Sequence, residues 1–279
     1  MLIFGVLTDE SDTKKSLQFQ KDATGSVALS NLSPVVLALR YLSKRYPSLL
    51  LIADVCLCAY TNHGHCGWLN SSGFIDNPKS IKQIAKVALH YAKNGAHIVA
   101  PSDMMDGRIK AIKSILFENE LQFRCSVMSY SSKYCSNFYG PFRDACHSAP
   151  SSSEEEEEDT VVCNMKDRST YQLPIDSREL GIRASIRCAE EGADFLMVKP
   201  GLPYLDIIRD VKNTVPNVPI AVYQVSGEYA MIWHGAQNGA FDLKDIVLET
   251  CRCMTRAGAS IIISYYTPRI LDWISDAKL

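Results

Sequence analysis

The 279-residue sequence has no run of apolar residues approaching the roughly 18 that a membrane-spanning helix requires. It also lacks an excess of charge, since 29 lysines and arginines stand against 31 aspartates and glutamates. No overall basic field therefore favours nucleic acid or anionic lipid as a partner. The N-terminal apolar stretch is too short for the hydrophobic region of a signal peptide, and acidic residues follow it at once. We therefore expect a cytoplasmic globular protein.

Seven short apolar segments are mostly continuous rather than alternating, which is typical of strands buried on both faces of a parallel sheet. They are Leu2–Val6, Leu49–Cys58, His97–Pro101, Cys125–Tyr130, Phe195–Pro200, Ile220–Val225 and Ala259–Tyr265. Helical periodicity between them covers Ser33–Tyr46, Lys79–Asn94, Gly107–Asn119, Asp176–Glu191, Tyr204–Asn213 and Asp242–Ala257. No glycine-rich phosphate loop follows the first segment, so a dinucleotide-binding fold has no support. The alternation predicts an α/β fold, with residues 1–279 forming a single domain.

Polar and reactive residues follow these strands at their C-terminal ends, where a TIM (β/α)₈-type barrel builds its active site. Seven strands are one short of the eight of such a barrel, so we expect the first strand–helix unit to be missing. The missing strand would leave apolar flanks at Leu2–Val6 and Ile261–Ser264 exposed.

The segment 148–160 breaks the pattern because it is low in complexity and strongly acidic, with five consecutive glutamates. Charges of one sign repel each other and bury no apolar area, so we expect a disordered surface insertion. It lies in a long connection between two predicted strands, where a barrel could carry a lid over its active site.

Three of the ten cysteines lie close together, as Cys56-x-Cys58-x₇-Cys66. Three thiolates in a short loop suit Zn²⁺, and three protein ligands leave a coordination position open, as in catalytic zinc sites. His63 and His65 could supply a fourth ligand or support the other ligands. The alternative is a set of reduced thiols at a strand end.

Lys199 ends an apolar segment, where desolvation would lower the pKa of its amine and make it a Schiff-base nucleophile. A lysine at a strand end can instead extend its amine to solvent. Lys133 follows the preceding predicted strand, and two close ammonium groups depress each other's pKa values. The pair therefore favours Schiff-base chemistry on a carbonyl substrate.

Several anion-binding side chains accompany the two lysines. Arg143 and Arg168 offer guanidinium groups that suit a carboxylate, although each alone could form a surface ion pair. Ser226 and Tyr265 follow the last two predicted strands and could hold a second carboxylate through their hydroxyl groups. Together these residues predict a carboxylated substrate that carries a carbonyl group.

Taken in order, the motifs closely resemble those of the porphobilinogen synthase family, also called δ-aminolevulinic acid dehydratases. The matching stretches are Asp54-Val-Cys-Leu-Cys, His-Gly-His-Cys66-Gly, Ala-Pro-Ser102-Asp103-Met-Met-Asp106-Gly-Arg108, Ser-Val-Met-Ser-Tyr130-Ser-Ser-Lys133, Phe-Tyr139-Gly-Pro-Phe142-Arg143-Asp144-Ala, Tyr-Gln172-Leu-Pro, Met-Val-Lys199-Pro-Gly-Leu-Pro-Tyr, Val-Ser226-Gly-Glu-Tyr-Ala-Met and Ile-Ser-Tyr265-Tyr. They cover almost the whole chain.

The resemblance implies a TIM-barrel hydro-lyase of haem biosynthesis, which condenses two molecules of 5-aminolevulinate into porphobilinogen with loss of two waters. Lys199 matches the family's Schiff-base lysine, and Lys133 matches its second active-site lysine. Cys56, Cys58 and Cys66 match the ligands of the catalytic Zn²⁺ in the zinc-dependent branch.

The resemblance also implies two carboxylate subsites. Arg143, Arg168 and Gln172 match the contacts of one substrate carboxylate, while Ser226 and Tyr265 match the contacts of the other. The remaining matched positions, which line or support the substrate site, are Asp54, Ser102, Tyr139 and Phe142.

Two features depart from the family. Its members carry an N-terminal arm, which holds a homo-octamer together, and a first strand–helix unit. Neither has a counterpart in this sequence. We therefore expect a truncated chain that does not form the octamer. The acidic segment lengthens the lid. The alternatives are an inactive fragment that acts as a non-catalytic zinc-binding subunit, and a class I aldolase, which accounts for Lys199 but not for the cysteines.

Overall fold

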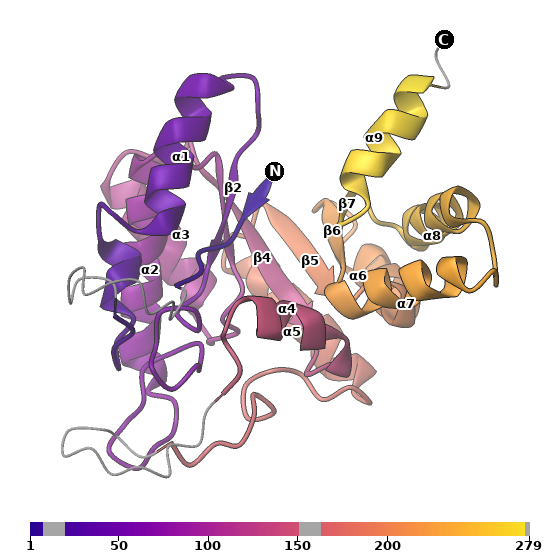
Figure 1. The fold of residues 1–279 in the computed structure, drawn as a ribbon. Coiled ribbons are helices and arrows are strands. Elements are labelled where there is room, and N and C mark those ends of the chain that lie inside the picture. Colours follow the sequence, from indigo (N-terminus) through magenta and orange to yellow (C-terminus); the bar gives the residue numbers. More distant parts are fainter. Residues whose placement is uncertain (8–19, 151–162, 277–279) are drawn as a thin grey trace. The chain divides into compact units, whose positions relative to one another are not determined.

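The computed structural model describes residues 1–7, 20–150 and 163–276, in which short strands alternate with helices (Figure 1). The strands are β1 (Leu2–Ile3), β2 (Ile52–Val55), β3 (Ile98–Pro101), β4 (Ser126–Lys133), β5 (Phe195–Lys199), β6 (Ile220–Gln224) and β7 (Ile261–Ser264). They pair in chain order from β1 to β7. Pairing is parallel between β1, β2, β3 and β4 and between β5, β6 and β7. The predicted parallel α/β alternation is therefore confirmed.

The helices of the described residues include all six that the periodicity predicts. The α-helices are α1 (Pro34–Arg45), α2 (Asn77–Lys93), α3 (Arg108–Glu118), α4 (Gly140–Ala145), α5 (Arg178–Glu190), α6 (Leu205–Thr214), α7 (Ser226–Gln237), α8 (Leu243–Ala257) and α9 (Thr267–Asp276). The short 3₁₀ helices are η2 (Ser26–Leu29), η3 (Asn137–Tyr139) and η4 (Leu202–Tyr204). Each of the seven predicted strands and six predicted helices thus overlaps an element of the expected type.

Two predictions of local structure need correction. The sequence does not predict α4, α7 or α9. No residue of α4 or α9 is fully buried, and two of the three buried residues of α7 are polar. The strand predicted to end at Tyr130 continues as β4 to Lys133. It can do so because the Ser132 hydroxyl, although buried, donates to the carbonyl of Gly181 at 2.7 Å.

The chain forms two compact units, each described by itself below. The first unit is Met1–Tyr130, Arg143–Gln172 and Glu191–Ala193. The second unit is Ser131–Phe142, Leu173–Glu190 and Asp194–Leu279. β4 begins in the first unit and ends in the second.

In the first unit, α2 shows how the sequence builds the local structure. The carboxylate of Asp76 accepts a hydrogen bond from the amide of Lys79 at 3.1 Å, which caps the helix N-terminus. Apolar residues recur at helical spacing on one face and are buried, including Ile84, Val87 and Tyr91. This buried face packs against β2, β3 and α3.

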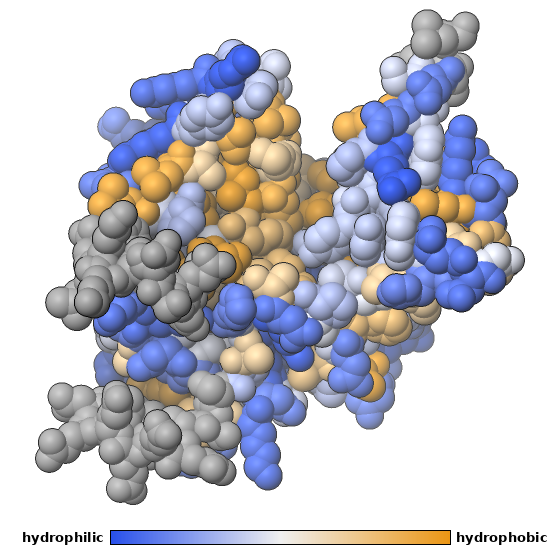
Figure 2. All heavy atoms as spheres, in the orientation of Figure 1, coloured by the Kyte–Doolittle hydropathy of each residue, from blue (hydrophilic) through white to orange (hydrophobic). Residues whose placement is uncertain are grey.

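The strand β1 forms one end of the sheet order and contributes two residues paired with β2. Figure 2 shows apolar side chains gathered over β1 and β2. Leu2 and Ile3 are half-buried, and Leu50 beside them is 53% exposed.

In the second unit, β5, β6 and β7 form parallel pairs, and β7 is half-buried throughout. Ile232, Val247 and Tyr266 form a buried cluster that joins α7, α8 and the residues after β7. The predicted residue Ser226 is the first residue of α7, two residues after the end of β6.

The predicted acidic segment 148–160 lies outside the described residues from residue 151 onward. Ser148, just before that boundary, is buried. No helix among the described residues is long and apolar enough to span a membrane.

Candidate functional site

The first unit brings together the three cysteines that the sequence predicts as metal ligands. The Sγ atoms of Cys56, Cys58 and Cys66 all lie within 4.8 Å of one another, and those of Cys56 and Cys58 are 3.4 Å apart. Cys56 and Cys66 are buried, and Cys58 is half-buried. Three soft donors at this separation can converge on a single metal ion.

The loop after β2 returns Cys66 to the other two cysteines through a compact turn. The amides of Tyr60 and Thr61 both donate to the carbonyl of Leu57, at 2.8 and 2.9 Å. The hydroxyl of Thr61 then donates to the carbonyl of His65 at 2.8 Å. Gly64 adopts a φ of +69°, which an L side chain rarely tolerates, so glycine suits the reversal.

Neighbouring thiols strongly shift the pKa values of Cys56 and Cys58. Hydrogen bonds to Cys58 and Cys66, together with burial, raise the pKa of Cys56 well above its ordinary value. The hydrogen bond from Cys56 lowers the pKa of Cys58, but the contact with Cys66 and burial outweigh it and raise that pKa to about 12. Without a cation Cys56 and Cys58 are therefore protonated at neutral pH, and a soft divalent metal would replace their protons.

The two histidines of the loop bond to other groups through their ring nitrogens. His65 lies 3.0 Å from the hydroxyl of Tyr171 through Nδ1 and 3.2 Å from the carbonyl of Met165 through Nε2. The Nε2 of His63 lies 3.4 Å from the carbonyl of Ala23, and burial lowers the pKa of His63 to about 4. These contacts favour a supporting role for both histidines over direct ligation. The sequence did not indicate the partner Tyr171.

Two predicted carboxylate-binding residues of the first unit carry buried polar atoms with no hydrogen-bond partner. Arg168 donates to the carbonyls of Gly64, at 2.9 Å, and Ser148, but its Nε has no partner among the described residues. Both side-chain amide atoms of Gln172, which is 3% exposed, also lack one. Buried groups of this kind are costly unless a ligand satisfies them. Arg143 begins the same stretch and is half-buried.

The predicted supporting residues Asp54 and Ser102 also lie in the first unit. Asp54 is on β2, and the amide of Ser102 donates to the carbonyl of Val55 at 3.0 Å. Beside them is a buried ion pair to which the sequence assigned no role: the Nε of Arg108 lies 3.6 Å from Oδ2 of Asp103. Burial raises the pKa of Asp103 to about 6 in spite of this pairing.

The second unit holds both predicted lysines at strand ends. Lys133 is the last residue of β4 and Lys199 the last of β5, and both are 7% exposed. The amide of Tyr134 donates to the carbonyl of Lys199 at 3.0 Å. The two lysines are therefore placed at the ends of neighbouring strands.

Three aromatic rings surround the amine of Lys199. Its Nζ lies 4.2 Å from the ring centroid of Tyr223, 5.1 Å from that of Tyr139 and 5.6 Å from that of Phe142. Tyr139 and Phe142 are residues that the family resemblance indicates, whereas Tyr223 lies within the predicted strand Ile220–Val225. The rings exclude water from the amine and can stabilise a cation.

The predicted residues Ser226 and Tyr265 lie in the same unit. The Oγ of Ser226 accepts a hydrogen bond from the amide of Phe142 at 3.1 Å and donates to the carbonyl of Phe138 at 3.4 Å. The hydroxyl of Tyr265 accepts a hydrogen bond from that of Tyr223 at 3.1 Å. Both hydroxyls thus lie close to the residues that surround Lys199.

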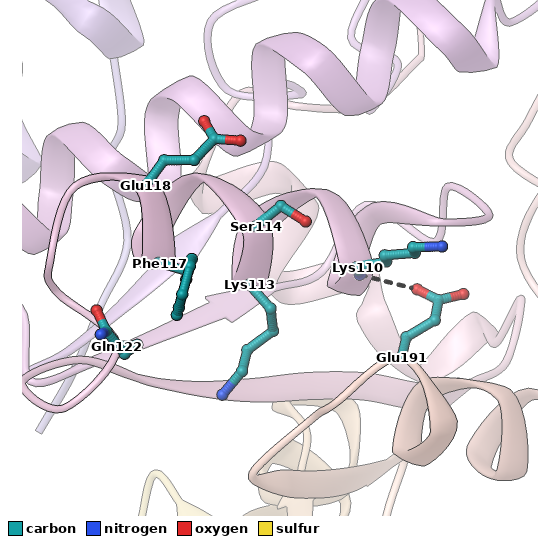
Figure 3. Close-up of a pocket in the computed structure, with 7 residues that line it drawn as sticks. All are labelled: Lys110, Lys113, Ser114, Phe117, Glu118, Gln122 and Glu191. Carbon is teal, nitrogen blue, oxygen red and sulfur yellow. Dashed lines mark hydrogen bonds between the residues drawn. The ribbon is translucent and has the colours of Figure 1, made fainter.

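A pocket of about 430 Å³ lies beside α3 and contains none of the predicted site residues (Figure 3). Its lining is formed by Lys110, Lys113, Ser114, Phe117, Glu118, Gln122 and Glu191. The carboxylate of Glu191 accepts a hydrogen bond from the amide of Lys110 at 3.1 Å, drawn as a dashed line.

Comparison with known proteins gives one consistent result. The family model described as delta-aminolevulinic acid dehydratase matches residues 1–273. The delta-aminolevulinic acid dehydratase of Bos taurus is 52% identical over 276 residues, which cover 99% of this chain and 77% of that protein. The Dictyostelium discoideum enzyme of the same name is 50% identical over 242 residues, covering 87% of this chain and 68% of that protein.

A solved structure agrees with the sequence comparisons. The delta-aminolevulinic acid dehydratase of Toxoplasma gondii ME49, in complex with its reaction product porphobilinogen, matches with a TM-score of 0.83 and 38% identity. The match covers 91% of this chain and 68% of that one. It confirms the predicted TIM-barrel class, and the matches together favour an enzyme over the non-catalytic fragment and the aldolase. The chain belongs to the delta-aminolevulinic acid dehydratase family, a family of lyases.

Proposed function

We propose that this chain condenses two molecules of 5-aminolevulinate into porphobilinogen, with Lys199 as the residue that forms a Schiff base with substrate. The observation that carries this assignment is the buried Lys199 amine, enclosed by three aromatic rings beside the end of the strand that carries Lys133. Family membership supports the same reaction.

The surroundings of Lys199 suit each stage of Schiff-base formation. The neutral amine adds to the ketone carbon of 5-aminolevulinate, and loss of water leaves a protonated imine. Exclusion of water favours the neutral amine before the addition. The faces of Tyr139, Phe142 and Tyr223 then attract the cation that forms. Lys133 would bind the second substrate molecule in the same way.

The polar side chains supply two sets of carboxylate contacts. Arg168 and Gln172 would hold one substrate carboxylate together with Arg143, since the Nε of Arg168 and both amide atoms of Gln172 are buried without a partner among the described residues. Ser226 and Tyr265 would hold the other through their hydroxyl groups. Fixing both carboxylates orients two identical molecules differently, which is what an asymmetric product requires. Asp54 and Ser102 would support the polar side of the centre.

We assign Zn²⁺ to Cys56, Cys58 and Cys66, because three clustered sulfur donors match its preference and leave one position open. When bound, the ion would supply Lewis acidity and a site for hydroxide. Self-association that stops short of the family's octamer, and a cytoplasmic location, belong to the same proposal, and light scattering and cell fractionation test them.

Borohydride reduction in the presence of 5-aminolevulinate tests the assignment of Lys199. Peptide mass mapping should find the adduct on Lys199, and Lys199→Ala should abolish turnover. Lys110→Ala, at an exposed lysine of α3, is the matched control and should behave as the wild type. An adduct confined to Lys133 would reverse the two lysine roles, and absence of any adduct would reject the proposal.

Metal analysis tests the assignment of Zn²⁺ to the three cysteines. The triple variant of Cys56, Cys58 and Cys66 to alanine should lose both bound zinc and turnover. Full turnover in a protein verified to be free of zinc would refute the assignment of the metal.

A further inference from the structure

Glu228 is a buried acid to which the proposed reaction assigns no role. It lies in the first turn of α7, directly after β6, and its side chain is completely buried. A carboxyl group in such a place is costly unless hydrogen bonds or charges compensate it.

Its carboxylate accepts hydrogen bonds from three backbone amides. Oε2 accepts from Val225 at 2.7 Å and from Gly201 at 3.1 Å, and Oε1 accepts from Leu202 at 2.6 Å. Every partner is a donor, so the site suits a carboxylate rather than a protonated acid. A Cβ added at Gly201 would lie 3.2 Å from Oε1, so glycine permits this close approach.

These three bonds join the two connections that flank the reactive lysine. Gly201 and Leu202 follow Lys199 by two and three residues, after β5, and Val225 follows β6, which carries Tyr223. The carbonyl of Lys199 is itself fixed by the amide of Tyr134 at 3.0 Å and the hydroxyl of Tyr139 at 3.2 Å. The chain is therefore held on both sides of the Lys199 amine.

The charges of Glu228 and Lys199 also interact. Burial raises the pKa of Glu228 above its ordinary value, and its three amide bonds and the positive charge of Lys199 offset only part of that rise. Because such an interaction is reciprocal, a carboxylate at this position favours the charged form of Lys199. Other titratable side chains on the elements packed around the lysine include Lys133, Tyr134, Tyr139, Tyr204, Tyr223 and Tyr265.

We propose that Glu228 is a positioning residue for Lys199: its buried carboxylate fixes the β5 and β6 connections and favours the cationic states of the lysine. The inference rests on the proposed Schiff base at Lys199. Glu228 does not touch the substrate in this scheme. It sets the place of the amine and the stability of the protonated imine.

Glu228→Gln tests the proposal because it keeps the size of the side chain and removes its charge. Loss of the charge should move the acidic limb of Schiff-base trapping at Lys199 to lower pH by about one unit. It should also lower kcat by about tenfold while KM changes little, because the protonated imine loses its countercharge. Glu249→Gln, at an exposed position of α8, is the matched control.

Glu228→Asp distinguishes the effect of the charge from that of the side-chain length, because aspartate keeps the carboxylate but is shorter. It keeps the negative charge, so the acidic limb should return towards the wild-type pH even if thermal stability falls as in Glu228→Gln. A lowered melting temperature with an unchanged pH profile in Glu228→Gln would show a merely structural role and overturn the inference. Absence of an adduct on wild-type Lys199 would instead overturn the proposed function, and this inference with it.

A reciprocal measurement covers the case in which Glu228 variants do not fold. In Lys199→Met protein labelled with ¹³C-glutamate, the NMR titration midpoint of the buried Glu228 carboxyl should rise by about one pH unit, since its cationic neighbour is gone. An unchanged midpoint would overturn the inference.

Discussion

Replacing Gly227 by alanine should damage the surroundings of Lys199 more than it damages the fold. Gly227 lies in the first turn of α7, where the backbone of Phe138 approaches it closely. An added Cβ would lie 2.6 Å from the carbonyl oxygen of Phe138, 2.8 Å from its Cα and 3.0 Å from its carbonyl carbon. All three are backbone atoms, so no side-chain rotation relieves the overlap.

The size of the displacement follows from these distances. Ordinary contact begins at 3.4 Å, so the Phe138 oxygen must retreat by 3.4 − 2.6 = 0.8 Å. If the segment moves as one piece, the 3.1 Å hydrogen bond from the Phe142 amide to Ser226 lengthens to about 3.9 Å and is lost. Overpacking and one lost hydrogen bond together cost about 2 kcal/mol. Tyr139 and Phe142 move away from Lys199 with the same segment.

The assay compares Gly227→Ala with Gly140→Ala. Gly140 lies in the same segment, has a φ of −46° and has no atom within 4 Å of an added Cβ. Gly140→Ala should therefore keep both its melting temperature and its rate of Schiff-base trapping. Gly227→Ala should melt about 4–8 °C lower and trap Lys199 about tenfold more slowly. Equal behaviour of the two variants would refute the reasoning.

Three other predictions concern the first unit. Because the raised pKa values of Cys56 and Cys58 keep both thiols protonated at neutral pH, metal binding should release at least two protons. These two protons alone should make the affinity rise by up to about hundredfold per pH unit below those pKa values. Chelator competition measures this, and a pH-independent affinity contradicts it. Gln172→Leu should raise KM about tenfold without lowering the melting temperature, because it removes two buried atoms that have no partner in the part of the chain that the structure describes. An unchanged KM would exclude Gln172 from the carboxylate contacts. Deleting Ser151–Asp159 should leave kcat intact, and its collapse at saturating substrate would show that the acidic segment takes part in turnover.

The strands could be predicted from the sequence because each is a short, continuous apolar run between polar breaks. The helix α7 could not, since its buried residues are Ser226, Glu228 and Ile232, two of them polar. A helix that buries polar groups at a functional site leaves little apolar periodicity to read. The end of β4 was misplaced for a related reason, because buried serines look like a loop.

The residues of the candidate site also differ in whether the sequence could predict them. The cysteine cluster could be predicted because its three ligands lie within eleven residues, so spacing alone brings them together. The three amides that Glu228 binds include two that lie more than twenty residues before it. Neither that arrangement nor the contact of His65 with Tyr171 leaves a local pattern, because each depends on how distant segments pack.

The contacts of the cysteine loop also set an order of events during synthesis. His65 bonds to the carbonyl of Met165, 100 residues later, and Arg168 reaches back 104 residues to Gly64. At about 5–20 residues per second, the three thiols leave the ribosome roughly 5–20 s before the residues that cover them. A newly made chain therefore presents an open thiol cluster to any metal ion or oxidant it meets, and only the finished unit encloses it.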